Sequence, residues 1–316
     1  MVSVSDYTIR VLLASKVKGV GRKALQALAM EPLFFQVKLE ELAETFPELA
    51  SLQPESLVYE KALKAAEEDL RQASERGHTI LSPLDPAYPR LLAATEDRPA
   101  LLYVAGDPAR FSAKAIAVIG TREPSEHGIE TARRITQYFG NAGWQIVSGL
   151  ALGLDSVAHK EALNHDGSTV AVMAHGLDAV YPKSNAALAD SIVKKGGLLV
   201  SEYGYGTPAF SGQFVERDKI QAALSKAVVM VQSDRGGGSL HASRAALRYG
   251  RFLIVPVATR ADITSGYEKA RGNIALTTGS VTEKLSILKC QESDLERLIV
   301  LRSKNDYEAI EAGLLT

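Results

Sequence analysis

Continuous apolar runs alternate with helical stretches through the middle of the chain. The apolar runs are typical of strands buried on both faces, and they occupy residues 115–119, 145–148, 169–174, 197–201, 227–232 and 252–257. Between them lie stretches with apolar residues at helical spacing, at 125–142, 155–165, 185–195, 214–225 and 239–250. Because buried strands that alternate with helices build parallel sheets, the pattern predicts a doubly wound α/β fold with a mainly parallel sheet.

The first 80 residues predict a separate helical domain. Apolar residues recur at helical spacing in Tyr7–Ala14, Lys23–Ala29 and Glu55–Glu75. Between the first two helices lies Gly19-Val-Gly21, a tight turn that helical DNA-binding hairpins also use. We favour an ordinary helix–helix turn, because two glycines are a weak signal.

The remaining segments flank the α/β core, which we place at residues 113–260. Residues 81–112 contain Pro83, Pro86, Pro89 and Pro99 near Tyr88 and Tyr103, which predicts an ordered connector. Residues 261–316 are polar and predict an extension of the core with short amphipathic helices such as Ser293–Ser303 and Asp306–Leu314. This tail has too few strand signals for a third domain, and no winged helix is recognisable in it.

Charge and cysteine content narrow the class of protein. The chain has 36 basic and 37 acidic residues, so no global field favours nucleic acid or membrane. Between residues 113 and 258, however, 15 Lys/Arg exceed 12 Asp/Glu, a net charge of +3. The single Cys290 excludes an internal disulfide and suits a reducing compartment. No signal-peptide pattern or 18-residue apolar run is present, so we expect a cytoplasmic protein without membrane attachment.

The loop after the first core strand carries candidate phosphate ligands. Residues 120–128 supply backbone amides, the Thr121 hydroxyl and the Arg122 guanidinium, with Ser125 as a plausible helix N-cap. The spacing matches neither the dinucleotide fingerprint nor the P-loop. A structural turn and an anion site remain equally good interpretations of this loop.

A second glycine-bearing loop, Ser148-Gly-Leu-Ala-Leu-Gly-Leu-Asp155, follows the next strand. Gly149 would allow a ligand to approach the backbone closely. For Asp155 we favour a capping role over a catalytic one, and for His159 a packed helix position over a general base. His175 and His241 lack metal-ligand spacing, so we predict no metal site and no catalytic residue.

Three further groups lie where strands end and helices begin. Lys183 follows the third core strand, where a phosphate ligand and a solvated lysine are equally good interpretations. Arg217 and Lys219 lie near the start of the helix predicted at 214–225, beside two acidic residues that offset their charge. The backbone amides of Gly237 and Gly238, with Ser239, predict an anion cradle at a helix N-terminus.

Taken in order, these motifs resemble the DprA/Smf family of DNA-processing proteins, over roughly Tyr88 to Val257. The most specific pieces are 148–155 with Ala158-His159, Gly176-Leu-Asp178, and Tyr181-Pro-Lys-Ser-Asn185. Ser201-Glu-Tyr203 and Gly238-Ser-Leu240 add to the resemblance, and Gly272-Asn-Ile-Ala-Leu276 is a plausible echo.

The resemblance implies an extended Rossmann-like core, an N-terminal helical domain of the SAM or helix-hairpin-helix type, and a non-catalytic function without a cofactor. It further implies binding of single-stranded DNA, dimerisation through the Rossmann-like domain, and loading of a RecA-type recombinase in recombination and natural transformation. The implied DNA-binding residues are Thr121, Arg122, Ser148, Gly149, Lys183, Asn185, Arg217, Lys219, Gly237, Gly238 and Ser239.

The chain departs from the family pattern in the helix predicted at 214–225. The family usually reads Phe-Pro-Arg-Arg-Asn-Arg-Ile, whereas Val215, Glu216 and Asp218 stand here at the Pro, first Arg and Asn positions. Leu152 also replaces an arginine of the family. The change from Arg to Glu at 216 removes two positive charge units, and the changes from Asn to Asp at 218 and from Arg to Leu at 152 remove one each. The site therefore loses about four positive units, which predicts weaker, less salt-sensitive DNA binding.

Two other functions remain open at this point. The depleted basic site and altered tail suit a regulator, for example the antitoxin-like partner of a toxin or effector in a phage-defence module that senses DNA or a nucleotide. A nucleotide phosphoribohydrolase-like enzyme is disfavoured, because residues 240–247 after the glycine loop contain no acid.

Overall fold

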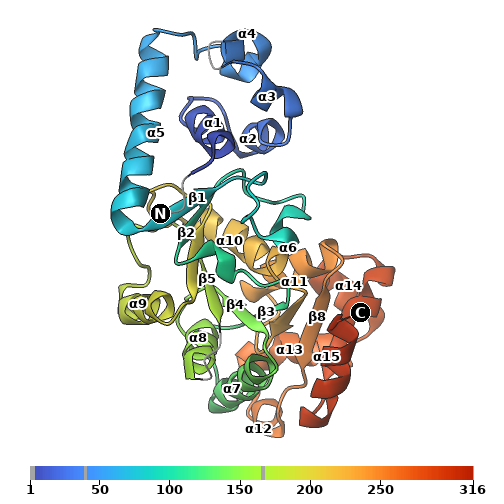
Figure 1. The fold of residues 1–316 in the computed structure, drawn as a ribbon. Coiled ribbons are helices and arrows are strands. Elements are labelled where there is room, and N and C mark those ends of the chain that lie inside the picture. The colour runs from blue at the N-terminus through green and yellow to red at the C-terminus, as the bar shows by residue number, and fades with distance from the viewer. Residues whose placement is uncertain (1–3, 39–40, 165–167, 316) are drawn as a thin grey trace.

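The computed structural model describes residues 4–38, 41–164 and 168–315. Within these ranges, nine strands form one sheet in the order β1-β2-β6-β5-β4-β3-β7-β8-β9 (Figure 1). The strands are β1 (His78–Leu81), β2 (Leu102–Ala105), β3 (Ala115–Ile119), β4 (Gln145–Ser148), β5 (Thr169–Met173), β6 (Leu198–Ser201), β7 (Ala227–Met230), β8 (Phe252–Pro256) and β9 (Leu298–Leu301). All neighbours pair in parallel except β1 with β2 and β2 with β6. The predicted mainly parallel α/β fold is confirmed.

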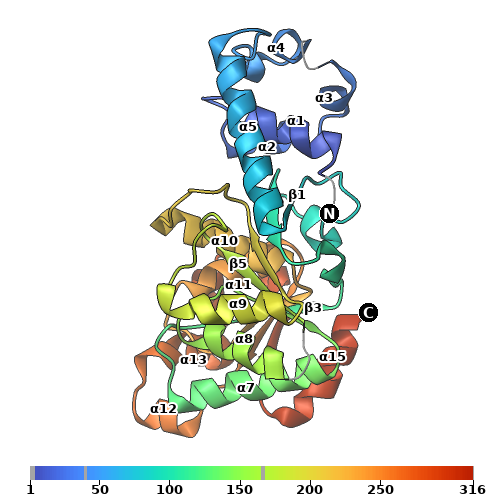
Figure 2. The same ribbon diagram turned by 60° about the vertical axis from the view of Figure 1, so that its left-hand side comes forward.

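Helices cover both faces of the sheet because its central strands are apolar on both sides. In β3, Ile116 and Val118 face one layer, and Ala117 and Ile119 face the other. The first layer contains α7 (Glu126–Asn141), α8 (Leu154–Asn164), α9 (Ala186–Lys194) and α15 (Tyr307–Leu315). The second contains α6 (Arg90–Ala93), α10 (Ser211–Ala223), α11 (Ser239–Arg248), α13 (Arg271–Thr278) and α14 (Val281–Leu288). Figure 2 shows the first layer in front of the sheet.

The six predicted core strands and five intervening helices are confirmed, with boundaries that differ by a few residues at most. Residue 165, the last of the helix predicted at 155–165, lies outside the described residues. Continuous apolar runs flanked by glycine and polar residues were sufficient to place these elements.

The tail differs from its prediction. Residues 293–303 do not form a helix: a 3₁₀ turn at Glu292–Arg297 is followed by β9, which pairs in parallel with β8. The four residues Leu-Ile-Val-Leu of β9 include two that are β-branched, and they extend the apolar sheet beyond β8. The second predicted tail helix is confirmed as α15.

The N-terminal helices pack around their own core above the sheet (Figure 1). They are α1 (Asp6–Ser15), α2 (Arg22–Leu28), α3 (Pro32–Gln36), α4 (Leu42–Thr45) and the long α5 (Leu57–Arg76). The chain then enters the sheet directly: the boundary predicted at 80/81 falls within β1, and the predicted connector contains β2. Tyr103 of β2 joins the two cores, since its hydroxyl donates to Asp69 of α5 at 2.6 Å.

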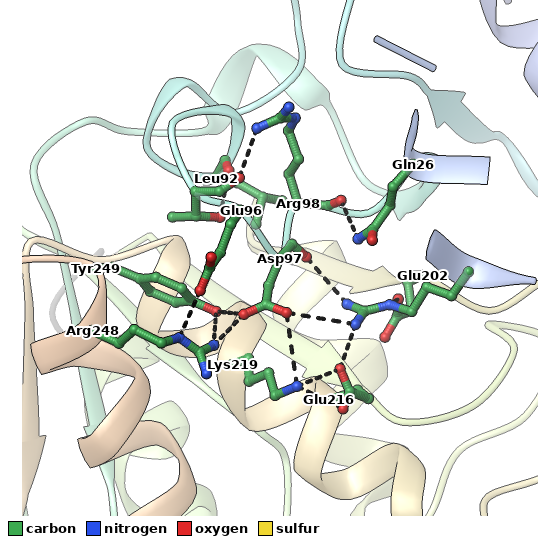
Figure 3. Close-up of polar contacts among 12 residues, drawn as sticks. Gln26, Leu92, Glu96, Asp97, Arg98, Glu202, Glu216, Lys219, Arg248 and Tyr249 are labelled. Carbon is green, nitrogen blue, oxygen red and sulfur yellow. Dashed lines mark hydrogen bonds and ion pairs between the residues drawn. The ribbon is translucent and has the colours of Figure 1, made fainter. Parts of the chain in front are cut away.

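Arg22, the first residue of α2, fixes the helical domain to the α/β core. Gly19-Val-Gly21 joins α1 to α2, as the favoured interpretation predicts. The Arg22 guanidinium donates to Glu202 at 2.9 Å, to Glu216 of α10, and to the backbone carbonyl of Asp97 at 3.2 Å. Figure 3 shows the three acceptor residues converging on this point.

Asp97 extends this contact to α11. Its carboxylate accepts a hydrogen bond from Tyr249 at 2.6 Å and pairs with Arg248 (Figure 3). Gln26 of α2 adds a hydrogen bond to the backbone carbonyl of Arg98 at 2.8 Å. The helical domain therefore rests on α10 and α11 through polar contacts.

No helix within the described ranges has both the length and the apolar character needed to cross a membrane.

Replacing Arg22 with alanine should destabilise the protein. Burial raises the pKa of Glu202, and Arg22 opposes that rise, so the variant leaves a buried carboxylate without its cation. We expect the free energy of unfolding to fall by about 1–3 kcal/mol, measured by chemical denaturation. Adding Glu202→Gln to Arg22→Ala should recover part of the loss, and Arg71→Ala, on an exposed pair of α5, should change stability little. An Arg22→Ala protein as stable as the wild type would contradict this role.

Candidate functional site

A pocket of about 720 Å³ opens at the carboxyl ends of β3 and β7. These strands are neighbours in the sheet, but the chain leaves β3 toward β4 on one side and β7 toward β8 on the other. The strand order reverses here, and ligands of open α/β sheets bind at such points. The walls are the loop after β3, the loop after β7, one face of α10, and Lys269.

The loop after β3 is held close to the loop after β7. The backbone amide of Thr121 donates to the Gln232 carbonyl at 2.9 Å. A Cβ at Gly120 would lie 2.9 Å from the same carbonyl oxygen and 2.3 Å from the Leu154 side chain. Glycine is therefore required for this close approach, and it sets Thr121 and Arg122 on the pocket wall.

Arg122 is the cation that this pocket leaves available. Its side chain is exposed and lies over the Phe214 ring, 5.4 Å from the centroid. Within the described part of the chain it has no carboxylate partner. Lys269, which also lines the pocket, is paired with Asp234 at 3.2 Å and lies 3.8 Å from the Glu123 carboxylate.

The N-terminus of α11 forms another wall of the pocket. Gly238 is the N-cap residue and has no side chain to cap the helix. The backbone N–H groups of Gly238 and Ser239 have no acceptor among residues 4–38, 41–164 and 168–315. Such N–H groups, with the helix dipole, favour an anion. Gly237, Gly238 and Ser239 thus lie together with Thr121 and Arg122, as predicted.

Arg217 lies in the wall of this pocket but is only 4% exposed. Its Nη1 donates to the Gly149 carbonyl and to the Val172 carbonyl at 3.3 Å, and it lies 3.8 Å from the Asp155 carboxylate. A Cβ at Gly149 would lie only 1.4 Å from Arg217 Nη1. The structure therefore brings Arg217 and Gly149 together, but in a contact that joins α10 to the ends of β4 and β5.

Ser148 and Asn185 are buried and bonded to the backbone of neighbouring loops. The Ser148 hydroxyl donates to the Val118 carbonyl at 2.7 Å. Asn185 Nδ2 donates to the Leu150 carbonyl at 2.8 Å and to the Ser156 hydroxyl at 2.9 Å. Both side chains support the loop after β4 without lining the pocket.

The two predicted lysines lie outside the pocket. Lys183 is exposed on the segment after β5. Lys219 points toward the helical domain, where its Nζ donates to Glu216 at 2.7 Å (Figure 3). Successive residues of a helix point about 100° apart, but which side of α10 faces the pocket depends on tertiary packing and could not be predicted from the local sequence.

His159 and Asp155 of α8 are both buried. His159 is fully buried, with Nδ1 2.8 Å from the Thr169 hydroxyl, and burial lowers its pKa to about 3, with Arg217 adding to the effect. It is a packed, neutral imidazole, as predicted. Asp155 was predicted as the N-cap of its helix, but it is the second residue of α8, and its carboxylate instead accepts from the loop amides of Gly149 at 3.2 Å and Ala151 at 3.4 Å. Among the described residues no cluster of His, Cys, Asp and Glu could hold a metal ion.

Two aromatic side chains complete the site and were not predicted. Phe214 lies between the pocket and a shallow hollow that is also lined by Leu152 and Tyr181. The Tyr181 ring is 52% exposed, and its centroid lies 5.9 Å from that of Phe214. Both residues belong to motifs quoted for the family, so an aromatic residue within such a motif was the signal that the sequence offered.

Asp218 is one of four acidic residues that line the pocket, with Glu123, Asp155 and Asp234. Its Oδ1 accepts from Gln221 Nε2 at 2.8 Å and lies 3.1 Å from Arg217 Nε. Burial raises its pKa to about 7; Arg217 opposes the rise, whereas the Asp155 carboxylate adds to it. The side chain therefore changes charge near neutral pH, close to the cations Arg217 and Arg122.

The family model for DNA recombination-mediator protein A matches residues 79–288 of this chain. Protein Smf of Escherichia coli is 36% identical over 188 residues, which cover 60% of this chain and 50% of that protein. DNA processing protein DprA of Bacillus subtilis is 34% identical over 178 residues, covering 56% of this chain and 60% of that one. The chain spans about half the length of the first of these relatives.

Two solved structures have a similar fold. DprA from Streptococcus pneumoniae superposes with a TM-score of 0.65 at 26% identity, covering 87% of this chain and 98% of that chain. DprA from Helicobacter pylori, described for its single-stranded DNA binding mode, superposes with a TM-score of 0.56 at 28% identity, covering 65% and 90%. The predicted resemblance is confirmed, and the chain belongs to the DNA recombination-mediator protein A family.

Proposed function

We propose that this protein binds single-stranded DNA in the pocket at the carboxyl ends of β3 and β7 and acts in DNA processing and recombination. The proposal rests on one observation: Arg122, which forms no ion pair among the described residues, and the uncapped N-terminus of α11 line the same pocket. The H. pylori relative, which is described for single-stranded DNA binding, supports it.

A backbone phosphate is the anion that these groups suit. Arg122 offers a planar fork of N–H donors, and the amides of Gly238 and Ser239 add donors at the positive end of α11. The Thr121 hydroxyl lies on the same wall. The proposed phosphate-contacting residues are therefore Thr121, Arg122, Gly237, Gly238 and Ser239.

The bases of a single strand need apolar surfaces, and the aromatic side chains beside the pocket supply them. Tyr181 is half exposed, and Phe214 lies below the Arg122 guanidinium. Aromatic rings bind unpaired bases by stacking, with little dependence on sequence. A strand whose phosphate lies at α11 would thus place neighbouring bases against Phe214 and Tyr181, with Lys183 nearby in sequence as a further cation.

The partners follow from the family rather than from the geometry. We propose a RecA-type recombinase and a second copy of this chain, joined through the Rossmann-like domain, as partners in recombination and natural transformation. The proposed function is binding without catalysis.

Reversing the charge of Arg122 should weaken single-stranded DNA binding. Arg122→Glu removes a phosphate contact and adds repulsion, so we expect Kd for a dT oligonucleotide to rise roughly tenfold or more at low salt. The slope of log K against log salt should fall by about one unit. Fluorescence anisotropy across a salt series measures both quantities. Arg133→Glu, an exposed charge reversal on α7, is the matched control and should bind as the wild type does; equal binding by Arg122→Glu would refute the pocket assignment.

Binding of a dT oligonucleotide should weaken as pH rises through about 7. Phosphate binds better when Asp218 is neutral, and this carboxyl loses its proton as pH passes its raised pKa of about 7. His241, which also lines the pocket, has a pKa lowered by burial, so a window from about pH 6.5 to about pH 8.5 isolates Asp218. Asp218→Asn should bind dT more tightly than the wild type at the upper pH and lose most of the dependence. A wild-type affinity that stays constant across this window would exclude the effect.

A further inference from the structure

One face of α10 forms a polar recess in the pocket. Phe214, Arg217, Asp218 and Gln221 lie at positions i, i+3, i+4 and i+7 of this helix, so their side chains share one face. The face is largely buried, with Gln221 2% exposed and the Asp218 side chain 14% exposed. Buried polar groups are normally satisfied by hydrogen bonds, so unmet donors or acceptors here indicate a ligand.

One carboxylate oxygen in the recess has no donor from the protein. Asp218 Oδ1 faces Gln221 and Arg217, but no donor within the described ranges reaches Oδ2. Gln221 uses its amide nitrogen to hold Asp218, and its own Oε1 is buried without a partner and is closed off from the pocket. The recess thus presents a carboxylate that Gln221 holds in orientation and that keeps one oxygen free of protein donors.

A carboxylate edge selects a partner with two adjacent N–H donors. Among the DNA bases only guanine has such a pair, at N1 and the exocyclic N2. Adenine and cytosine place one amino group beside an acceptor nitrogen, and thymine places one N–H between two carbonyl oxygens. The pocket volume, about 720 Å³, lies within the range that accommodates a nucleotide-sized ligand.

We infer that the recess formed by Asp218 and Gln221 accepts a guanine base, so that the pocket prefers a guanine-containing single strand. The inference rests on the proposed function and adds base preference to it. Phe214, one turn before Asp218 on the same face, supplies an apolar wall beside the base. The residue at 218 is one of the departures from the family pattern, where asparagine would offer one acceptor and one donor group in place of two acceptors.

The charged groups around Asp218 determine how the preference depends on pH. Arg217 lies beside it on α10, Asp155 faces it from α8, and Arg122 faces it from the loop after β3. His241 and Lys269 line the far side of the pocket. Guanine donors favour the ionised carboxylate, so guanine preference should increase as pH rises through about 7, opposite to the trend for dT.

The test compares dT oligonucleotides that carry one central substitution: guanine, hypoxanthine, adenine or none. Hypoxanthine lacks the N2 amino group and keeps only one of the two donors. At about pH 8 we expect guanine to lower Kd roughly tenfold relative to thymine, with hypoxanthine intermediate. Asp218→Asn should abolish the guanine preference while it strengthens dT binding, and Asp190→Asn, an exposed carboxylate-to-amide change on α9, should preserve the preference.

The outcomes separate this inference from the proposed function. Equal affinity for all four oligonucleotides would overturn the guanine recess and leave single-stranded DNA binding intact. A guanine preference retained in Asp218→Asn would also overturn it. Should none of the oligonucleotides bind, the proposed function fails; calorimetry with dGMP against dTMP then tests the recess alone, and equal or absent binding of the two nucleotides refutes it.

Discussion

The burial of one guanidinium determines how the candidate site is built. Arg217 is 4% exposed, and a cation removed from water must be paired and hydrogen-bonded. Its Nη1 donates to the carbonyls of Gly149 and Val172, and the carboxylates of Asp155 and Asp218 offset its charge, although its Nε has no hydrogen-bond acceptor among the described residues. These contacts hold α10 against the ends of β4 and β5. They also require glycine at 149, because a side chain there would occupy the position of the guanidinium.

The same constraint divides the charges of α10 between two sites. Successive residues on a helix point about 100° apart, so when Arg217 is directed inward, Glu216 is directed toward the helical domain. Glu216 pairs there with Arg22 and Lys219, whereas Asp218 follows Arg217 into the pocket. One helix thus both supports the N-terminal domain and forms a wall of the pocket, and the ion pairs on its outer side belong to domain packing.

The sequence predicted the scaffold better than the site because apolar runs report burial, whereas side-chain direction depends on tertiary contacts. The strands around β3 are continuous apolar runs and were placed correctly. Residues 298–301 were predicted as part of a helix. They form a strand because they pair with the edge of β8, and no local pattern reports that pairing. Within the site, glycines and hydroxyls identified the loops, since their backbone geometry is local. Lys219 and Arg217 are only two residues apart, yet their opposite directions follow from packing that no local pattern records.

The placement of these charges changes the interpretation of the family departures. Counted along the sequence, Glu216 accounts for about two of the four positive units lost from the site. In the fold its carboxylate faces Arg22, so that substitution belongs to domain attachment and contributes little to the pocket field. Of the departures that change charge, those that border the pocket and its hollow are Asp218 and Leu152. One is a titratable acceptor beside a buried arginine, and the other an exposed apolar side chain beside Tyr181. Under the proposed function, a site altered in this way loses cationic strength but gains an acceptor and apolar surface, which would shift recognition from the phosphate backbone toward the bases.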